Sequence, residues 1–268
     1  MLRTRGDRIA EYAACALIVL VFVVLYAPII VSAVFSVVEI RRGEILWETF
    51  TFQHYVTLWS NESVMDSLSN TAIVALCSVG LASILAVLLA LYTQWHGAIG
   101  RTALTLLIYL PFLLPPIVTG LALLVASANA DMGRGIFTII IGHTIFVLAV
   151  AYRLVLTRLQ ALPPSLIEAS FDLGASRWQT LRHVLLPHLA SSILTGALLA
   201  LTLSFDETLI SSFVAGNEMT LPLRLWAMMR VGFTPEINAL VTQVLLVSIV
   251  LALVAASLLK PKGEPEED

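Results

Sequence analysis

Six apolar runs, each long enough to cross a membrane, constrain the fold of this chain more than any other feature of its sequence. About 20 helical residues cross a hydrocarbon core of roughly 30 Å. Because lipid offers no partner for backbone N–H and C=O groups, each run is predicted to be a helix. The expected fold class is an all-α integral membrane protein with six transmembrane helices. The runs cover residues 13–38, 69–93, 102–127, 136–157, 189–209 and 238–259.

The composition rules out a soluble globular protein. Of the 268 residues, 59% are hydrophobic and only 12% are charged, and the mean hydropathy is +0.93. Soluble domains carry about 25% charged residues, so this chain has too little polar surface to coat a folded particle. The runs are also too uniformly apolar for the alternating strands of an outer-membrane barrel. We expect a single transmembrane domain over residues 1–268.

The first run is expected to be a retained anchor rather than a signal peptide. It is longer than the roughly 7–15 apolar residues of a signal sequence, and no small-x-small cleavage site follows promptly. Cys15 and Cys77 both fall inside apolar runs, where they are expected to act as small apolar side chains. Their number and spacing fit neither a disulfide framework nor a metal site.

The distribution of Lys and Arg predicts which loops face the cytoplasm. Six spans place both termini on one side, and if that side is the cytoplasm, ten basic residues lie there and five lie outside. This ratio follows the positive-inside rule. Residues 158–188 then form the one long cytoplasmic loop, and 39–68 and 210–237 are the larger external segments. The cytoplasmic ten are Arg3, Arg5, Arg8, Arg101, Arg153, Arg158, Arg177, Arg182, Lys260 and Lys262. The external five are Arg41, Arg42, Arg134, Arg224 and Arg230.

The loop 158–188 is predicted to contain two short helices joined at a glycine. Residues 163–164 are both proline and should end the fourth span. Ser165 and Glu168 have the spacing of a capping box, which predicts the start of a helix of about two turns. That helix can end at Gly174, since glycine readily takes the left-handed conformation of a C-cap.

A second capping box, Ser176 with Gln179, predicts a second short helix over 177–186, ended by Pro187. One apolar stripe is expected along it, formed by Trp178, Leu181 and Leu185. Isolated helices of this length are marginal in water, so a packing partner is expected to stabilise them.

The residues of this loop resemble the EAA loop of the permease subunits of type I ABC importers, which are driven by ATP. The family pattern is Glu-Ala-Ala, three residues, Gly, nine residues, Ile, one residue, Leu-Pro. The matching positions are Glu168, Ala169, Ser170, Gly174, Val184, Leu186 and Pro187. Ser170 and Val184 depart from the pattern but keep size or character. The resemblance implies the type I permease fold, and that these residues and Ala175 couple the chain to a cytoplasmic ATPase.

The chain is expected to be neither an enzyme nor a cofactor-binding protein. It has no Gly-x-x-x-x-Gly-Lys-Ser/Thr sequence and no convincing catalytic or metal-binding set. The resemblance implies that two partner ATPase subunits bind ATP and Mg²⁺. It also implies a second permease subunit, either a copy or, as we expect, a similar partner, and an extracytoplasmic solute-binding protein. The implied location is the bacterial inner membrane, and no nucleic-acid partner is expected.

Asp206 and Glu207, with Phe205 before them, are the candidate residues of the solute pathway. A carboxylate at the membrane centre costs about 2.5–3.5 kcal/mol. Asp206 lies roughly 26 Å along its helix, nearer the outer interface, so a pathway role and a solvated helix end both stay open. The segments 203–207, 212–216, 220–222, 230–232 and 235–239 resemble polyamine-importer permeases, which implies a polyamine or related cation as the solute. Related permeases carry ferric iron, phosphonates or other small solutes.

Several alternatives stay open at this point. Pro111, Pro115 and Pro116 predict a kink or break in the third run, either a tolerated bend or one that opens a pathway. His143 lies mid-run and is expected to pack or hydrogen-bond rather than bind a metal. External aromatic residues fit either a surface for the binding protein or an interfacial belt, namely Trp47, Phe50, Phe52, Tyr55 and Trp59.

A self-sufficient secondary transporter or channel is the alternative function. It would need a relay of charges within the membrane, for which only Asp206 and Glu207 are available. Paired inverted repeats are not visible in the sequence. A membrane enzyme is a third class, and it lacks a plausible catalytic set.

Overall fold

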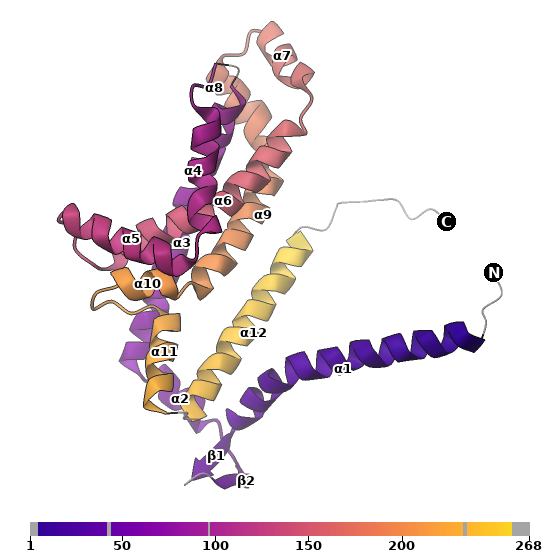
Figure 1. The fold of residues 1–268 in the computed structure, drawn as a ribbon, viewed down its shortest axis with the longest axis vertical. Helices are drawn as coiled ribbons and strands as arrows, with labels where there is room; N and C mark the ends of the chain where they lie inside the picture. Colours follow the sequence, from indigo (N-terminus) through magenta and orange to yellow (C-terminus); the bar gives the residue numbers. More distant parts are fainter. Residues whose placement is uncertain (1–4, 42–43, 96, 233–234, 259–268) are drawn as a thin grey trace. The chain divides into compact units, whose positions relative to one another are not determined.

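Helices form nearly the whole chain, as the apolar runs predict (Figure 1). The structure, a computed structural model, describes residues 5–41, 44–95, 97–232 and 235–258. The chain divides into two compact units, residues 1–62 with 227–251 and residues 63–226 with 252–268. Some residues used in the sequence analysis lie outside the described ranges, namely Arg3, Arg42, Lys260, Lys262 and residue 259 at the end of the last run.

The first unit combines helices with a two-stranded hairpin. The strands are antiparallel, with Ile40 paired to Ile45 and an irregularity between Val38 and Glu39. The first helix ends at Phe35, before the predicted end of its run, because the hairpin begins at Val38. The elements are α1 (Arg5–Phe35), β1 (Val38–Arg41), β2 (Glu44–Phe50), α2 (Gln53–Trp59) and most of α12 (Pro235–Leu258).

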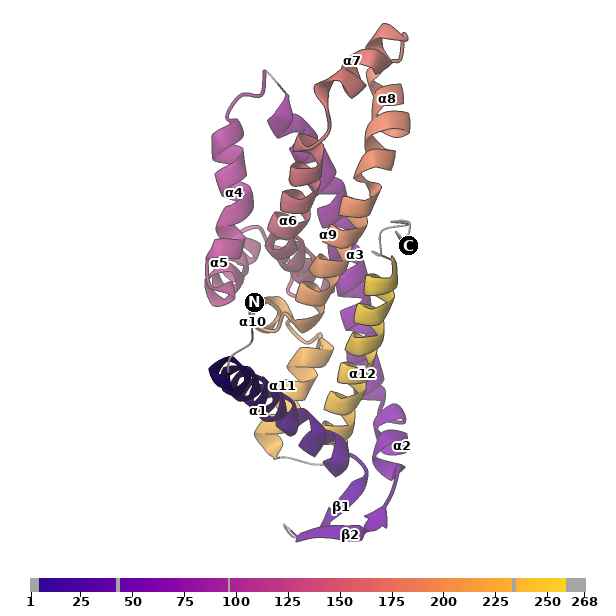
Figure 2. The ribbon, with the colours of Figure 1, turned by 90° about the vertical axis from the view of Figure 1, so that its right-hand side faces the viewer.

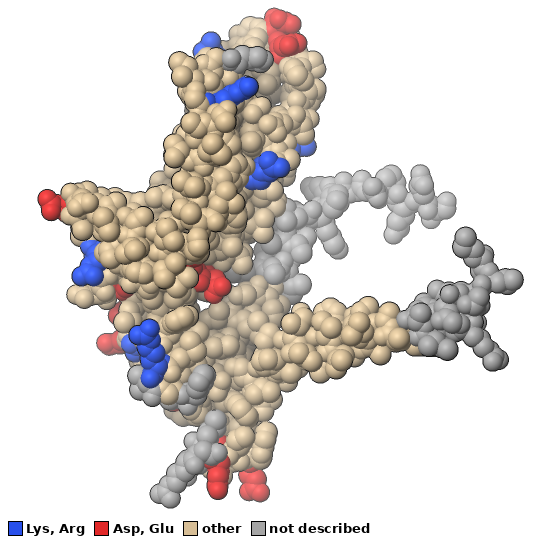
Figure 3. Space-filling view, viewed as in Figure 1, with Lys and Arg blue, Asp and Glu red and all other residues tan. Residues whose placement is uncertain are grey.

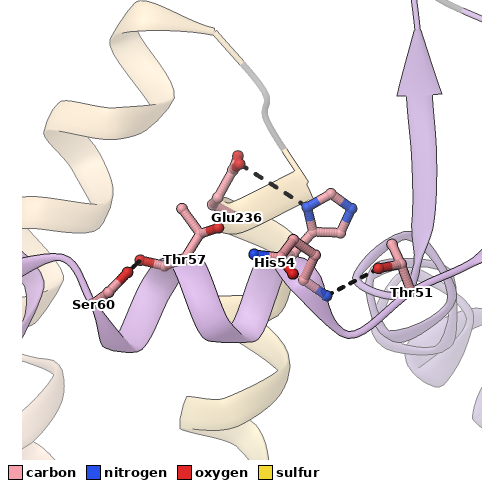
Figure 4. A network of polar contacts seen from close by, with 6 residues as sticks. Thr51, His54, Thr57, Ser60 and Glu236 are labelled. Atoms are coloured by element: carbon pink, nitrogen blue, oxygen red, sulfur yellow. Dashed lines mark hydrogen bonds and ion pairs between the residues drawn. The ribbon is translucent and has the colours of Figure 1, made fainter.

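Polar contacts join the helices of the first unit. His54 Nδ1 of α2 lies 4.0 Å from Glu236 Oε1 in the first turn of α12 (Figure 4). Ser32 Oγ of α1 donates to Asn238 Oδ1 of α12 at 3.1 Å. These contacts fix both the end of α1 and the helix after the hairpin against the start of α12.

The second unit contains the remaining elements and both candidate sites. Its helices are α3 (Glu62–Gln94), α4 (Arg101–Leu113), α5 (Pro116–Asn129), α6 (Ile136–Gln160), α7 (Pro164–Asp172), α8 (Arg177–Thr180), the π-helical turn η1 (Leu181–Leu185), α9 (Leu186–Asp206), α10 (Leu209–Val214) and the greater part of α11 (Leu221–Val231).

Helix α6 lies between α4 and α9 in the second unit (Figure 2). Tyr152 is fully buried in α6, and its ring meets that of Tyr109 of α4 edge-on. Small residues bring α6 and α9 close together, since a Cβ on Gly196 would lie only 3.4 Å from Ala151 Cα. Transmembrane helices commonly pack through small residues, because lipid tails are as apolar as large side chains.

The third apolar run is broken, as its prolines predict. Helices α4 and α5 meet at an angle of 110°. Leu114, which precedes Pro115, is extended, because the ring of a proline disfavours helical conformation in the residue before it. Helix α5 therefore turns aside and packs against α10. That this bend opens a solute pathway stays a hypothesis.

Every predicted run falls mainly on a helix, so the helical prediction is confirmed. Four described stretches are long and apolar enough to cross a membrane, namely α1, α3, α6 and the helix over Arg177–Asp206. The bent pair α4–α5 would make a fifth, and α12 is apolar over Pro235–Val250. Helix α9 ends at Asp206, before the predicted end of its run at residue 209. That all six runs cross the membrane stays a prediction.

Candidate functional site

The first helix of the loop 158–188 begins differently from the prediction. Its N-cap is Pro163, Pro164 lies in its first turn, and no side chain caps it, so the predicted capping box of Ser165 with Glu168 is wrong. Proline is favoured at the first helical position, because its missing N–H has no helical partner there and its φ suits the helix. The helix therefore starts before Ser165 could cap it. Glu168 and Ala169 are exposed on its surface.

Gly174 ends α7 as predicted. Its φ is +82°, in the region that favours glycine. The Gly174 N–H donates to Phe171 O at 2.9 Å, and the Ala175 N–H donates to Ser170 O at 3.0 Å. These two bonds form a Schellman motif, which satisfies the last carbonyls of α7 and turns the chain toward α8.

The predicted capping box at the start of α8 is confirmed. The Ser176 N–H donates to Gln179 Oε1 at 2.7 Å, and the Gln179 N–H donates to Ser176 Oγ at 3.3 Å. Across the turn, the hydroxyls of Ser170 and Thr180 lie 2.9 Å apart, and both residues are buried. Ser170, a departure from the EAA pattern, therefore joins α7 to α8 through a contact that alanine could not make.

The prediction that Pro187 ends the second helix is wrong. The helix is continuous over Arg177–Asp206. In η1 the Leu186 N–H bonds to Leu181 O, five residues back, which is the π-helical pattern. This wider turn lets the chain pass a proline that would otherwise interrupt the helix. Val184 lies in this turn, and the loop is connected to α9 without a break.

Three apolar side chains of the loop are left uncovered. Leu173 is 89% exposed, Trp178 is 64% exposed and Phe171 is 46% exposed. We call these three residues the apolar loop surface. Charged side chains lie around the same end of the second unit (Figure 3). The predicted stripe is divided, because Leu185 is buried in the core and Leu181 packs against it, whereas Trp178 is exposed.

The junction of α9 and α10 separates two neighbouring carboxylates. We call residues 204–211 the elbow. Asp206 is exposed, whereas Glu207 is only 9% exposed. Glu207 Oε1 accepts the Ile210 N–H at 2.9 Å, so this carboxylate caps the short helix α10. Phe205 is half-buried beside them.

His143 of α6 hydrogen-bonds to both sides of the elbow, as its expected role requires. Its Nδ1 lies 2.8 Å from Ser204 Oγ of α9, and its Nε2 lies 2.8 Å from Ser211 Oγ of α10. Neither serine is expected from the sequence to reach His143, since hydroxyls in apolar helices usually bond to their own backbone. Across the described part of the chain, no group of three His, Cys, Asp or Glu residues could hold a metal ion.

Two glycines make room for the elbow. A Cβ on Gly142 would lie 2.6 Å from Ile210 Cγ2, and one on Gly120 would lie 3.1 Å from Ile210 Cα and 2.9 Å from Phe213 Cδ2. Ile210 itself is fully buried. The elbow is therefore held between α5 and α6 with no space for a further methyl group.

The sequence matches a known family over most of its length. Residues 82–260 match the binding-protein-dependent transport system inner membrane component. The spermidine/putrescine transport system permease protein PotC of Escherichia coli (strain K12) is 30% identical over 243 residues, which cover 90% of this chain and 92% of PotC. The putrescine transport system permease protein PotI of the same strain is 32% identical over 237 residues, which cover 85% of this chain and 84% of PotI.

Solved structures share the fold. A bacterial ABC transporter involved in the import of the acidic polysaccharide alginate aligns with a TM-score of 0.76 and 18% identity, covering 97% of this chain and 100% of that chain. The inward-facing MetNI methionine ABC transporter aligns with a TM-score of 0.60 and 18% identity, covering 76% and 95%. The family match sets aside a secondary transporter, a channel and a membrane enzyme. The chain belongs to the binding-protein-dependent transport system inner membrane components, the non-catalytic permease subunits of ATP-driven importers.

Proposed function

We propose that the loop 158–188 couples this permease to its ATPase. The apolar loop surface carries the proposal, because large apolar side chains that are exposed together mark protein contacts. Helices as short as α7 and α8 also need packing to be stable. Since α8 continues through η1 into α9, a displacement of the loop would be passed to the elbow. The proposed coupling residues are Glu168, Ala169, Ser170, Gly174, Ala175, Val184, Leu186 and Pro187.

The proposed assembly surrounds this chain with the partner subunits expected of an ATP-driven importer. Two ATPase subunits bind ATP and Mg²⁺ at the cytoplasmic face, where the loop and both termini of this chain lie. A second, similar permease subunit completes the pathway, and a solute-binding protein delivers solute to the external segments. The excess of Lys and Arg on the loop side of the spans supports this orientation.

A charge on the apolar loop surface is expected to weaken ATPase binding. Leu173→Asp replaces a side chain that is 89% exposed, so it leaves the packing of the permease unchanged. In the complex it removes the burial of a leucine, worth about 1.5–3 kcal/mol, and the amount of co-purifying ATPase should fall at least about tenfold. Ile99→Asp is a matched control, because Ile99 is also 89% exposed and lies on the neighbouring cytoplasmic link. Equal loss in both variants would contradict the docking site.

We further propose that the solute is a polyamine or a related cation. PotC and PotI, which resemble this chain over most of its length, are named for spermidine and putrescine. Asp206 is exposed at the elbow, where its negative charge would attract an amine, and Phe205 lies beside it. We assign Glu207 to the same pathway. Its role there is to cap α10, next to Asp206 in the chain.

The two carboxylates of the elbow are expected to respond differently to loss of charge. Asp206→Asn should slow spermidine uptake about tenfold, the effect of losing an attraction of about 1.4 kcal/mol. Glu207→Gln should retain most uptake, because an amide oxygen can still accept the Ile210 N–H. Uptake is measured in proteoliposomes with the binding protein and ATPase present. Normal uptake by Asp206→Asn would contradict the proposed role of Asp206 in the solute pathway.

A further inference from the structure

The hydrogen bonds around His143 can be assigned a direction. Ser211 Oγ donates its one hydrogen to Glu207 O at 3.2 Å. At its other contact Ser211 must therefore accept, so Nε2 of His143 carries a hydrogen and donates it. In a neutral imidazole Nδ1 is then an acceptor, and the Ser204 hydroxyl donates to it. The neutral imidazole of His143 thus hydrogen-bonds to a hydroxyl on each side of the elbow, and the polar hydrogens of His143, Ser204 and Ser211 are all donated.

The elbow has little other support from its own backbone. Glu207 is extended, and Glu207 and Thr208 separate the two helices. Its other contacts include the cap from Glu207 to Ile210, the bond from Thr208 Oγ1 to Asp206 O at 3.2 Å, and the packing of Ile210 against the two glycines. Gly142 precedes His143 in the chain, so one turn of α6 both makes room for the elbow and binds it.

We infer that His143 is a positioning residue of the permease, which fixes the direction in which Asp206 projects by hydrogen-bonding both sides of the elbow. The inference rests on the pathway role proposed above for Asp206. Asp206 lies between Ser204 and Ser211 in the chain, so fixing both serines limits where its carboxylate can move. A charged group serves a binding site best when surrounding hydrogen bonds hold it in place. His143 acts through the elbow rather than by touching the solute.

Thiol labelling at position 206 measures this effect directly. The full transporter is prepared with Cys15→Ala and Cys77→Ala in this chain, and Asp206→Cys is added as the reporter. His143→Phe keeps a ring in the site but removes both hydrogen bonds. The rate of labelling by a cationic methanethiosulfonate reagent should change about fivefold, because losing a buried hydrogen bond shifts a conformational equilibrium by that amount.

Further variants distinguish a positioning role of His143 from a general contribution of its side chain to packing. Ser204→Ala removes one of the two bonds to His143, so it should change the rate in the same direction as His143→Phe but by less. Ser211→Ala removes the other bond to His143 and also the bond to Glu207 O, so it should change the rate in that direction as well. His143→Gln supplies one donor and one acceptor and should restore the rate. Ser78→Ala is the matched control, since buried Ser78 donates to Ile140 O of α6 at 3.1 Å without touching the elbow. If the elbow variants label at the rate of Ser78→Ala, the inference is overturned, and the two serine variants decide this even if His143→Phe does not assemble.

Uptake distinguishes this inference from the function on which it rests. In the chain that keeps Asp206, His143→Phe should slow spermidine uptake while the amount of co-purifying ATPase is unchanged. Slowed uptake by Asp206→Asn with unaltered labelling in the His143 variants would overturn the His143 inference alone. Altered labelling with normal uptake by Asp206→Asn would overturn the pathway role instead.

Discussion

Gly174→Val is expected to reduce coupled transport strongly while leaving membrane insertion intact. At a φ of +82°, an ordinary side chain costs about 1–2 kcal/mol, and a β-branched one costs more. A Cβ here would meet nothing within 4 Å, so the effect is one of backbone conformation alone. The chain would leave the left-handed conformation, lose the bonds to Phe171 and Ser170, and redirect α8 relative to α7. ATP-driven uptake by the reconstituted transporter should fall at least about tenfold.

Two substitutions control for this result. Gly174→Asn should retain most uptake, because asparagine tolerates the left-handed conformation better than other residues. Gly133→Val should have little effect, since Gly133 does not have a positive φ and a Cβ added to it would also meet nothing within 4 Å. Normal uptake by Gly174→Val would show that coupling does not need this turn.

The loop shows where local sequence rules suffice. Gly174 and the pair Ser176–Gln179 follow short-range rules of backbone conformation and capping, and the structure confirms both. The rules failed at Ser165 and Pro187, where another influence outweighs the local preference on which each prediction rested. At the first site a proline already occupied the first helical position. At the second, a π-helical turn preserved a helix that a proline would be expected to end, because the packing of Leu185 and Leu189 in the core favours continuity.

The elbow shows where the sequence does not suffice. Asp206 and Glu207 are adjacent carboxylates, and nothing local distinguishes the exposed one from the one that caps α10. The contacts of His143 join residues 61 and 68 positions apart, which no periodic pattern connects. Such contacts depend on how α6, α9 and α10 pack, and apolar runs specify helices without specifying their neighbours.

The prolines of the third run predict part of the local structure but not how it packs. They predict a break, yet only the packing shows that α5 turns to meet α10. Gly120 lies at that contact, and its importance cannot be read from the sequence, because a glycine in an apolar helix can be either closely packed or free. Gly80 of α3 is free, with nothing within 4 Å of an added Cβ.

Gly120→Val is expected to disable the elbow and with it solute uptake. The first added carbon would lie 3.1 Å from Ile210 Cα, a backbone atom that cannot rotate away. Overpacking of this kind costs about 1–3 kcal/mol, and relief requires α10 to move away from α5. Because only Thr208 lies between α10 and Glu207, such a movement displaces Asp206. Uptake should fall at least about tenfold, and the melting temperature of the purified transporter should also fall.

The other glycines make this prediction specific. Gly80→Val places the same side chain in an apolar helix with open space around it, so uptake should stay near normal. Gly142→Ala should also reduce uptake, because its added carbon would lie 2.6 Å from Ile210 Cγ2, which is attached to the stiff, branched Cβ of a buried residue. Equal effects at Gly120 and Gly80 would show that the contact between α5 and α10 does not control the position of the elbow. Loss of uptake on substitution of Gly120 and Gly142, with normal uptake on substitution of Gly80, therefore tests whether close packing against Ile210 holds the elbow in place.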